Sequence, residues 1–154
     1  MESLTLTQSQ AKQIIAHARA EAPLEACGLL GGRQRCVLQI YPARNTLRSS
    51  TRYLVEPVEL LAALQDMAER GWGPDPLAIY HSHPRGPGTP SETDIAKAYY
   101  PDSIYIIVAH LERPRPSLRG FSIIAGQVSE VELKIMYDQA QTGPAAQLQT
   151  DDGV

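Results

Sequence analysis

The stretch from residue 78 to residue 94, AIYHSHPRGPGTPSETD, constrains the fold of this chain more than any other stretch. An apolar run ends in His81-Ser82-His83-Pro84, and a loop of glycine and proline follows it. The run predicts a buried strand. Alternate side chains of a strand point the same way, so we expect His81 and His83 to share one face. Pro84 and the loop predict that the strand stops there and that the chain turns back.

The segment after this loop, Ser91-Glu92-Thr93-Asp94, predicts the start of a helix and has two interpretations. Serine followed three residues later by an acid is a helix-capping signature, and Asp94 would favour the positive end of the helix dipole. Alternatively, Asp94 on the first helical turn reaches the two imidazoles. Two histidines and one aspartate with room for a fourth ligand describe an open zinc site.

The histidine pair alone is also compatible with a solvated or hydrogen-bonded pair. The combination of strand, His-x-His-Pro, short rigid loop and Ser-x-x-Asp strengthens the interpretation as a metal site, which no one of these parts carries alone.

Composition limits the classes of protein that this chain can belong to. Its 154 residues predict one domain, and 43% hydrophobic and 20% charged residues suit a soluble globular protein. The net charge of −3 gives no electrostatic case for binding nucleic acid or an anionic membrane. The apolar runs are shorter than a membrane span, and the N-terminus lacks the layout of a signal peptide. We therefore expect a cytoplasmic location with free thiols at Cys27 and Cys36.

Hydrophobic periodicity predicts an α/β (α+β) fold, a mixed central sheet flanked by helices. Helices are expected from Thr7 or Ser9 to about Ala22, from Pro57 to near Gly71, and from Ser91 to Tyr99. Strands are expected within 24–32 and at 35–41, 53–55, 77–83, 103–109, 118–125 and 128–136. In the second helix Leu60, Leu61, Leu64 and Met67 are expected to face the core. The domain is expected to span 1–137, followed by a mobile polar tail over 138–154.

Three further ionisable residues have unremarkable interpretations when they are taken alone. Glu25 stands at the mouth of the first strand, where an ordinary exposed acid is the usual expectation. His17 lies in the first helix and is expected to have a surface or packing role. His110 lies next to a polar loop, where a solvated side chain is expected.

Taken together, these segments resemble the JAMM/MPN+ zinc metallopeptidases over about residues 5–135. The residues that carry the resemblance are Pro23-x-Glu25-x-Cys27-Gly28-Leu29-Leu30-x-Gly32, then His81-Ser82-His83-Pro84, and then Thr89-Pro90-Ser91-x-x-Asp94. Asn45, followed by Tyr53 and Pro57, is similar to the compact prokaryotic members. The resemblance implies the cytidine-deaminase-like JAMM/MPN fold.

The resemblance also implies a role for each site residue. His81, His83 and Asp94 would be the ligands of one zinc ion per chain. Glu25 would be the general acid/base, and Ser91 would polarise the substrate carbonyl. The implied reaction is hydrolysis of a peptide or isopeptide bond at the C-terminal Gly-Gly of a ubiquitin-like or sulfur-carrier protein. Oligomeric state, carrier and leaving group are left open by the sequence.

Three rival functions fit the sequence less well. A non-catalytic MPN scaffold domain typically lacks one or more of the ligands, whereas this chain has all of them. A zinc deaminase of nucleosides expects His-x-Glu together with Pro-Cys-x-x-Cys, and the sequence lacks that combination because it has no Pro-Cys-x-x-Cys. A DNA-repair relative with a JAMM-like pattern would carry His-Asn-His-Pro, and the acidic balance gives no support for DNA contact.

Overall fold

The computed structural model describes residues 3–138, which contain eight strands and three helices. Along the chain these elements are β1 (Leu4–Thr7), α1 (Gln8–Glu21), β2 (Cys27–Arg33), β3 (Cys36–Ala43), α2 (Pro57–Glu69), β4 (Ala78–His83), α3 (Glu92–Ala96), β5 (Ile104–Ala109), β6 (Ser117–Ile124), β7 (Gln127–Val131) and β8 (Leu133–Met136). None of the described helices is long and apolar enough to cross a membrane. The tail expected over 138–154 lies, after its first residue, outside the described residues.

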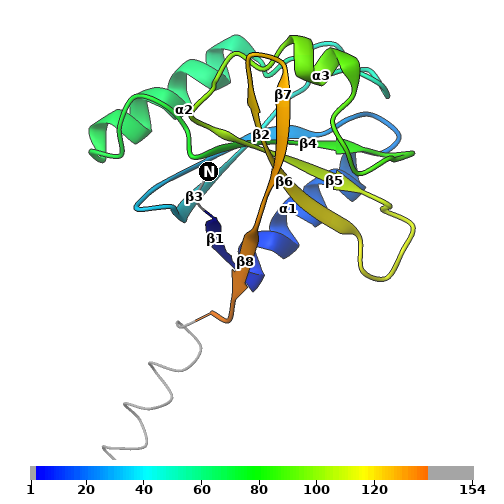
Figure 1. Cartoon of the computed structure of the whole chain (residues 1–154), viewed down its shortest axis with the longest axis horizontal. Helices are drawn as coiled ribbons and strands as arrows, with labels where there is room; N and C mark the ends of the chain where they lie inside the picture. The colour runs from blue at the N-terminus through cyan, green and yellow to red at the C-terminus, as the bar shows by residue number, and fades with distance from the viewer. Residues whose placement is uncertain (1–2, 139–154) are drawn as a thin grey trace, which may run out of the picture.

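The eight strands form one mixed sheet in the order β7-β6-β5-β4-β2-β3-β1-β8. β4 is parallel to β5, and β1 is parallel to both β3 and β8, while the remaining neighbours are antiparallel. β7 and β8 stand at the two ends of this order, yet only Glu132 separates them in the chain. The sheet therefore curls until its ends meet along one stretch of chain, where β7 runs into β8 (Figure 1). The expected mixed sheet flanked by helices is confirmed.

The two faces of the sheet carry separate hydrophobic cores. Tyr80 of β4 packs in the core that includes buried residues of α1. Its neighbour Ile79 packs in the core that includes Ala63 and Met67 of α2. Figure 1 shows α1 on one side of the sheet and α2 with α3 on the other. Because successive side chains of a strand alternate between the faces, the odd-numbered residues of β4 point toward α2 and α3.

Local signals in the sequence explain where α1 and α2 begin. Thr7 caps α1 through a capping box with Gln10, and Ala11, Ile14 and Ala18 are buried on one stripe. In α2, Pro57 occupies the first turn, where a backbone N–H would have no acceptor within the helix. Both helices confirm the expected positions.

The expected core face of α2 is wrong at one residue. Met67 is buried and Leu60 and Leu64 are half-buried, but Leu61 is 60% exposed. The buried stripe centres on Leu60, Ala63 and Met67, and Leu61 lies about 100° around the helix from Leu60, away from that centre.

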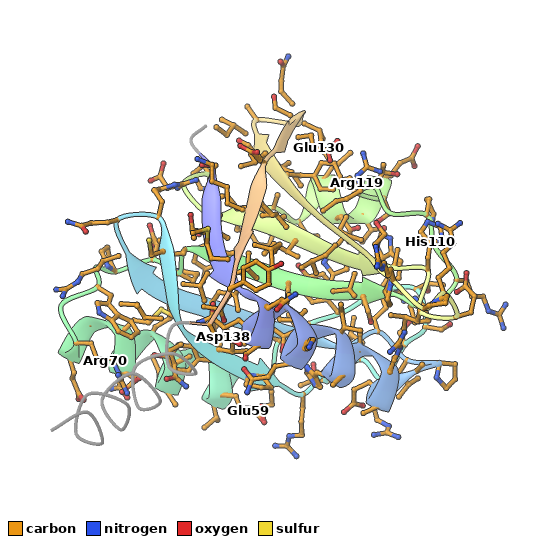
Figure 2. The ribbon with its side chains drawn as sticks, turned by 90° about the horizontal axis from the view of Figure 1, so that it is seen from below. Glu59, Arg70, His110, Arg119, Glu130 and Asp138 are labelled. Atoms are coloured by element: carbon orange, nitrogen blue, oxygen red, sulfur yellow. The ribbon has the colours of Figure 1, made fainter. Side chains whose placement is uncertain are left out.

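The hairpin of β6 and β7 turns where the sequence predicted it. Ala125 and Gly126 both have positive φ, 51° and 80°, as a two-residue hairpin turn requires. Arg119 of β6 pairs with Glu130 of β7 at 2.8 Å on the outer surface, where Figure 2 labels both. An exposed pair of this kind contributes little stability, so we attribute the stability of the hairpin to its turn and its buried residues.

Two expected strands differ from the structure, and one strand of the structure was not expected. The strand expected at 53–55 is only an isolated bridge between Asn45 and Val55, because the Asn45 side chain takes the backbone N–H of Leu54 that a ladder would need. The last expected strand is divided at Glu132, whose carbonyl accepts from Leu4 of β1. β1 itself was not predicted.

Helix α3 is also shorter than expected. It has five residues and ends at Ala96, although the pattern predicted a helix as far as Tyr99. The backbone N–H of Tyr100 bonds instead to the Tyr105 hydroxyl, 3.0 Å away, which draws the chain out of the helix.

Candidate metal centre

Two separate segments of the chain meet at one edge of the sheet, the edge formed by the ends of the strands. β4 ends there with His81 and His83, which are 1% and 7% exposed. β2 begins there, because Cys27 is the antiparallel partner of His81. Glu25, two residues before Cys27, is thereby carried to the histidines. It is 3% exposed, so the expectation of an ordinary exposed acid is wrong.

Three ligand atoms converge on the α2–α3 side of this edge. His81 Nε2 lies 3.0 Å from His83 Nε2, and Asp94 Oδ2 lies 3.1 Å and 3.0 Å from the same two atoms. Such a triangle resembles one face of a tetrahedron of zinc ligands, whose edges are about 3.4 Å for bonds of about 2.1 Å. The three donors therefore fit a metal ion in their spacing as well as in their chemistry.

The loop after β4 fixes the orientation of His83. His83 Nδ1 lies 2.7 Å from the carbonyl oxygen of Pro87. A carbonyl oxygen only accepts, so Nδ1 carries the proton and donates it. In the neutral form of His83 the lone pair of Nε2 is then directed into the triangle, and metal-binding histidines are commonly oriented by such a hydrogen bond from the other ring nitrogen.

His81 is held by stacking rather than by a hydrogen bond at its outer nitrogen. Its ring lies 4.4 Å from the ring of Tyr53, with 20° between the planes. Its Nδ1 is buried and has no hydrogen-bond partner among the described residues. Burial lowers the pKa of His81, which favours the neutral imidazole that coordinates metals. For His83 burial acts in the same direction, but hydrogen bonds to Asp94 and Pro87 outweigh it and raise the pKa.

The Glu25 carboxylate is the fourth group of the cluster. Ligand atoms of Glu25, His81 and His83 all lie within 4.8 Å of one another. Oε1 of Glu25 is buried and has no hydrogen-bond partner among the described residues. Burial raises the pKa of Glu25 to about 7. A buried polar atom without a partner is unfavourable, and a cation or its bound water at the triangle would satisfy it.

The structure reconciles the two interpretations of the Ser91 segment. Ser91 Oγ accepts from the backbone N–H of Asp94 at 3.0 Å, and the Ser91 N–H donates to Asp94 Oδ2 at 2.9 Å. The capping box is therefore present, and it also directs the Asp94 carboxylate at both imidazoles. Burial disfavours this charge, but the hydrogen bonds from both histidines and from Ser91 hold the pKa of Asp94 well below its usual range.

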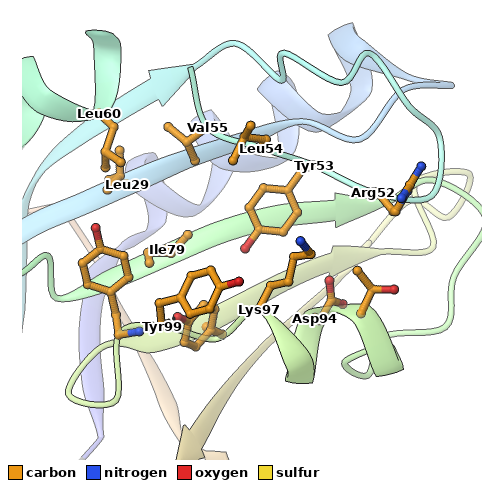
Figure 3. Close-up of a pocket in the computed structure, with 13 residues that line it drawn as sticks. Leu29, Arg52, Tyr53, Leu54, Val55, Leu60, Ile79, Asp94, Lys97 and Tyr99 are labelled. Carbon is orange, nitrogen blue, oxygen red and sulfur yellow. Dashed lines mark hydrogen bonds between the residues drawn. The ribbon is translucent and has the colours of Figure 1, made fainter. Parts of the chain in front are cut away.

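A cavity of about 400 Å³ opens beside the triangle. Asp94 lies at one end of it, and Leu29 and Ile79 form an apolar floor (Figure 3). Tyr53 and Lys97 line it from opposite sides. This cavity could not be predicted from the sequence, because its walls come from the segment before α2 and from α3, which lie together only in the folded chain.

Comparisons with known proteins show the family to which the chain belongs. The family described as "Prokaryotic homologs of the JAB domain" matches residues 7–123, which include all five candidate site residues. The CysO-cysteine peptidase of Mycobacterium tuberculosis is 36% identical over 129 residues, 80% of this chain and 84% of that protein. The chain belongs to the prokaryotic JAB domain family. A probable TtuB-protein conjugate cleaving protease of Thermus thermophilus is 45% identical over 84 residues, 54% of this chain and 55% of that protein.

Solved structures share the fold of this family member. A protein of Desulfitobacterium hafniense, solved in solution, has a TM-score of 0.78 and 38% identity over 88% of this chain and 94% of its own. A JAB1/MPN domain protein of Archaeoglobus fulgidus has a TM-score of 0.55 and 19% identity over 86% of this chain and 99% of its own. The JAMM/MPN fold implied by the sequence is thereby confirmed.

Proposed function

We propose that this chain is a zinc-dependent peptidase that binds one zinc ion. It hydrolyses the peptide or isopeptide bond at the C-terminal Gly-Gly of a ubiquitin-like or sulfur-carrier protein. The observation that carries the proposal is the triangle of His81, His83 and Asp94 beside the unpartnered carboxylate oxygen of Glu25. Relatives named as a CysO-cysteine peptidase and a TtuB-protein conjugate cleaving protease support the substrate class.

His81, His83 and Asp94 would hold the metal. Three protein ligands leave a fourth position open, as in catalytic zinc sites. Zinc in such a site would act as a Lewis acid and lower the pKa of its bound water to about 7. The Pro87 carbonyl and the capping box around Ser91 would keep the ligands aligned, because each fixes one side chain on the triangle.

Glu25 would act as the general acid/base. Its buried oxygen lies near the ligand atoms and has no hydrogen-bond partner in the part of the chain that the structure describes, so it could accept a proton from the attacking water. The same carboxyl would return that proton to the leaving amine. A pKa near 7 suits a group that both takes and gives a proton at neutral pH.

Ser91 would stabilise the oxyanion. Its hydroxyl oxygen accepts from the Asp94 N–H through one lone pair, so its own proton remains available to donate. A donor of this kind contributes about 3–4 kcal/mol to the transition state in other hydrolases. Capping and catalysis are therefore compatible roles for one residue.

The cavity beside Asp94 would take the carrier tail. It is mostly apolar and leads to the ligand triangle. Two terminal glycines let a peptide backbone approach a narrow site closely. The loops 44–56 and 110–116 are short, which supports a compact enzyme that acts on small carriers rather than one with long ubiquitin-gripping insertions. We also propose a cytoplasmic location, supported by the free thiols of Cys27 and Cys36.

The test pairs metal content with cleavage. The purified chain is assayed for zinc and then mixed with two substrates, a carrier that carries cysteine after Gly-Gly and a carrier joined to a lysine side chain. We expect about one zinc per chain and cleavage of at least one substrate that a chelator abolishes. Zinc without cleavage of either would indicate instead a non-catalytic MPN domain that binds zinc. Failure to take up zinc would contradict the metal site.

A further inference from the structure

Asn45 uses all of its side-chain hydrogen-bonding positions to tie the segment before α2 together. Its Nδ2 donates to the carbonyl oxygens of Glu25, at 3.1 Å, and of Arg52, at 3.0 Å. Its Oδ1 accepts from the backbone N–H groups of Leu47 and Leu54, both at 3.1 Å. One amide thus connects the backbone of Glu25 to three points of the segment 47–54.

These contacts fix one side chain in particular. Arg52 and Leu54 are the residues directly before and after Tyr53, so Asn45 holds the backbone on both sides of Tyr53. Because the same amide also holds Glu25, the position of Tyr53 is set relative to that carboxylate. Stacking on His81 then fixes the plane of the Tyr53 ring.

The hydroxyl of Tyr53 has no hydrogen-bond partner in the described part of the chain. Three tyrosines outside the segment before α2 do have one: the hydroxyl of Tyr41 bonds to Asp66, that of Tyr80 to His17, and that of Tyr105 to the backbone of Tyr100, whereas Tyr100, which lines the same cavity as Tyr53, shows none among the described residues. Tyr53 instead lines the cavity beside Asp94, and its hydroxyl points into that cavity in Figure 3. A half-buried hydroxyl that faces a cavity is suited to a ligand that brings an acceptor.

We propose that Tyr53 binds the carrier tail through a hydrogen bond from its hydroxyl to a backbone carbonyl of the tail, and that Asn45 is the positioning residue that places Tyr53. The inference rests on the proposed function, because an extended tail in the cavity supplies the carbonyl oxygens. A backbone acceptor is present in any sequence, so this contact selects an extended chain rather than a particular side chain. The ring of Tyr53 is flat, so a glycine residue of the tail fits beside it.

The first test removes only the hydroxyl. For Tyr53→Phe we expect about a 3- to 10-fold rise in KM for a carrier fusion, the usual effect of losing one hydrogen bond. The Kd of a fluorescent carrier-tail peptide ending in Gly-Gly should rise equally, while kcat and zinc content stay within about twofold. Tyr137→Phe is the matched control, because Tyr137 is 83% exposed and does not line the cavity. Equal peptide Kd values for Tyr53→Phe and Tyr137→Phe would overturn the proposal, as would loss of zinc in Tyr53→Phe.

The second test asks whether Asn45 acts through Tyr53. Asn45→Asp keeps the side-chain volume and the acceptor oxygen, so the variant is expected to fold. It loses the donors to Glu25 and Arg52. If Asn45 places Tyr53, removal of the hydroxyl should change the peptide Kd less than twofold in the Asn45→Asp background. A purely structural role would leave the two effects additive, and additivity would overturn the positioning role.

Peptide binding separates this inference from the proposed function. Wild-type chain that binds the tail and cleaves the fusion, with Tyr53→Phe unchanged, overturns the inference alone. Binding that weakens in Tyr53→Phe without any cleavage supports the tail contact and contradicts the proposed catalysis. Wild-type chain that neither binds nor cleaves overturns both.

Discussion

Among single residues, Glu25 is the acid whose buried Oε1 has no hydrogen-bond partner within residues 3–138. For Glu25→Gln we expect zinc content to stay unchanged and kcat to fall at least about 100-fold, since an amide cannot shuttle a proton. The variant should fold as well as the wild type, because a neutral amide has no charge to desolvate. Steady-state kinetics and metal analysis provide the measurement. Glu21→Gln serves as a control at a nearby acid that is half exposed, and retained activity in Glu25→Gln would remove Glu25 from the mechanism.

A second residue-scale prediction concerns the ligands. His83→Ala should lose zinc, because only two of the three converging atoms remain. His17→Gln is the matched control: His17 is bonded to Tyr80 in the core on the opposite face of the sheet, so its loss should leave zinc content unchanged. Metal analysis after gel filtration distinguishes the two variants. Full zinc occupancy in His83→Ala would contradict the ligand assignment.

At the scale of elements, the loop after β4 supports the metal centre from outside. Gly86 has φ of +70°, and a Cβ there would lie 3.3 Å from Cε1 of His110. Gly86→Ala therefore adds about 1–2 kcal/mol of backbone strain and should displace the neighbouring Pro87 carbonyl that orients His83. We expect zinc affinity to fall about 10-fold, as when other hydrogen bonds that orient metal-binding histidines are lost. Titration against a chelator of known affinity measures this fall.

A control variant separates the effect of the loop on His83 from the general effect of backbone strain. Gly71 has φ of +75° and an added Cβ there would meet nothing within 4 Å. Gly71→Ala should cost similar stability and leave zinc affinity unchanged. Equal zinc affinity in the two alanine variants would show that the loop does not act on His83.

The arrangement of the elements also explains which features could be predicted from the sequence. The strand of the His pair and the capping signature were predictable because each is local: apolar run, alternation and Ser-x-x-Asp all fall within one stretch. The burial of Glu25 was not, because it follows from the register that pairs Cys27 with His81, far apart in sequence. Likewise Asn45 and Tyr53 matter through contacts between segments. Residue patterns alone gave them no role beyond a family likeness.

In the molecule as a whole, the candidate metal would join parts that otherwise hold together unequally. His81 and His83 belong to a strand in the middle of the sheet, whereas Asp94 belongs to α3, a five-residue helix without a fully buried residue. Ligand binding to the folded state alone stabilises it, by about 4 kcal/mol at a thousand times Kd. Removing zinc should therefore lower Tm by about 10 °C. Scanning calorimetry with and without chelator tests this.

The loss should also be uneven within the molecule. Without the metal, α3 keeps only its cap and a few half-buried contacts, while β4 and β5 keep their ladder and both cores. Hydrogen exchange should thus accelerate over residues 91–98 and change little over β4 and β5. Asp94→Asn, which weakens the link between α3 and the sheet, should make both Tm and exchange at α3 nearly independent of zinc. Uniform acceleration across the sheet would mean instead that the metal centre supports the whole fold, and that α3 is not its separable part.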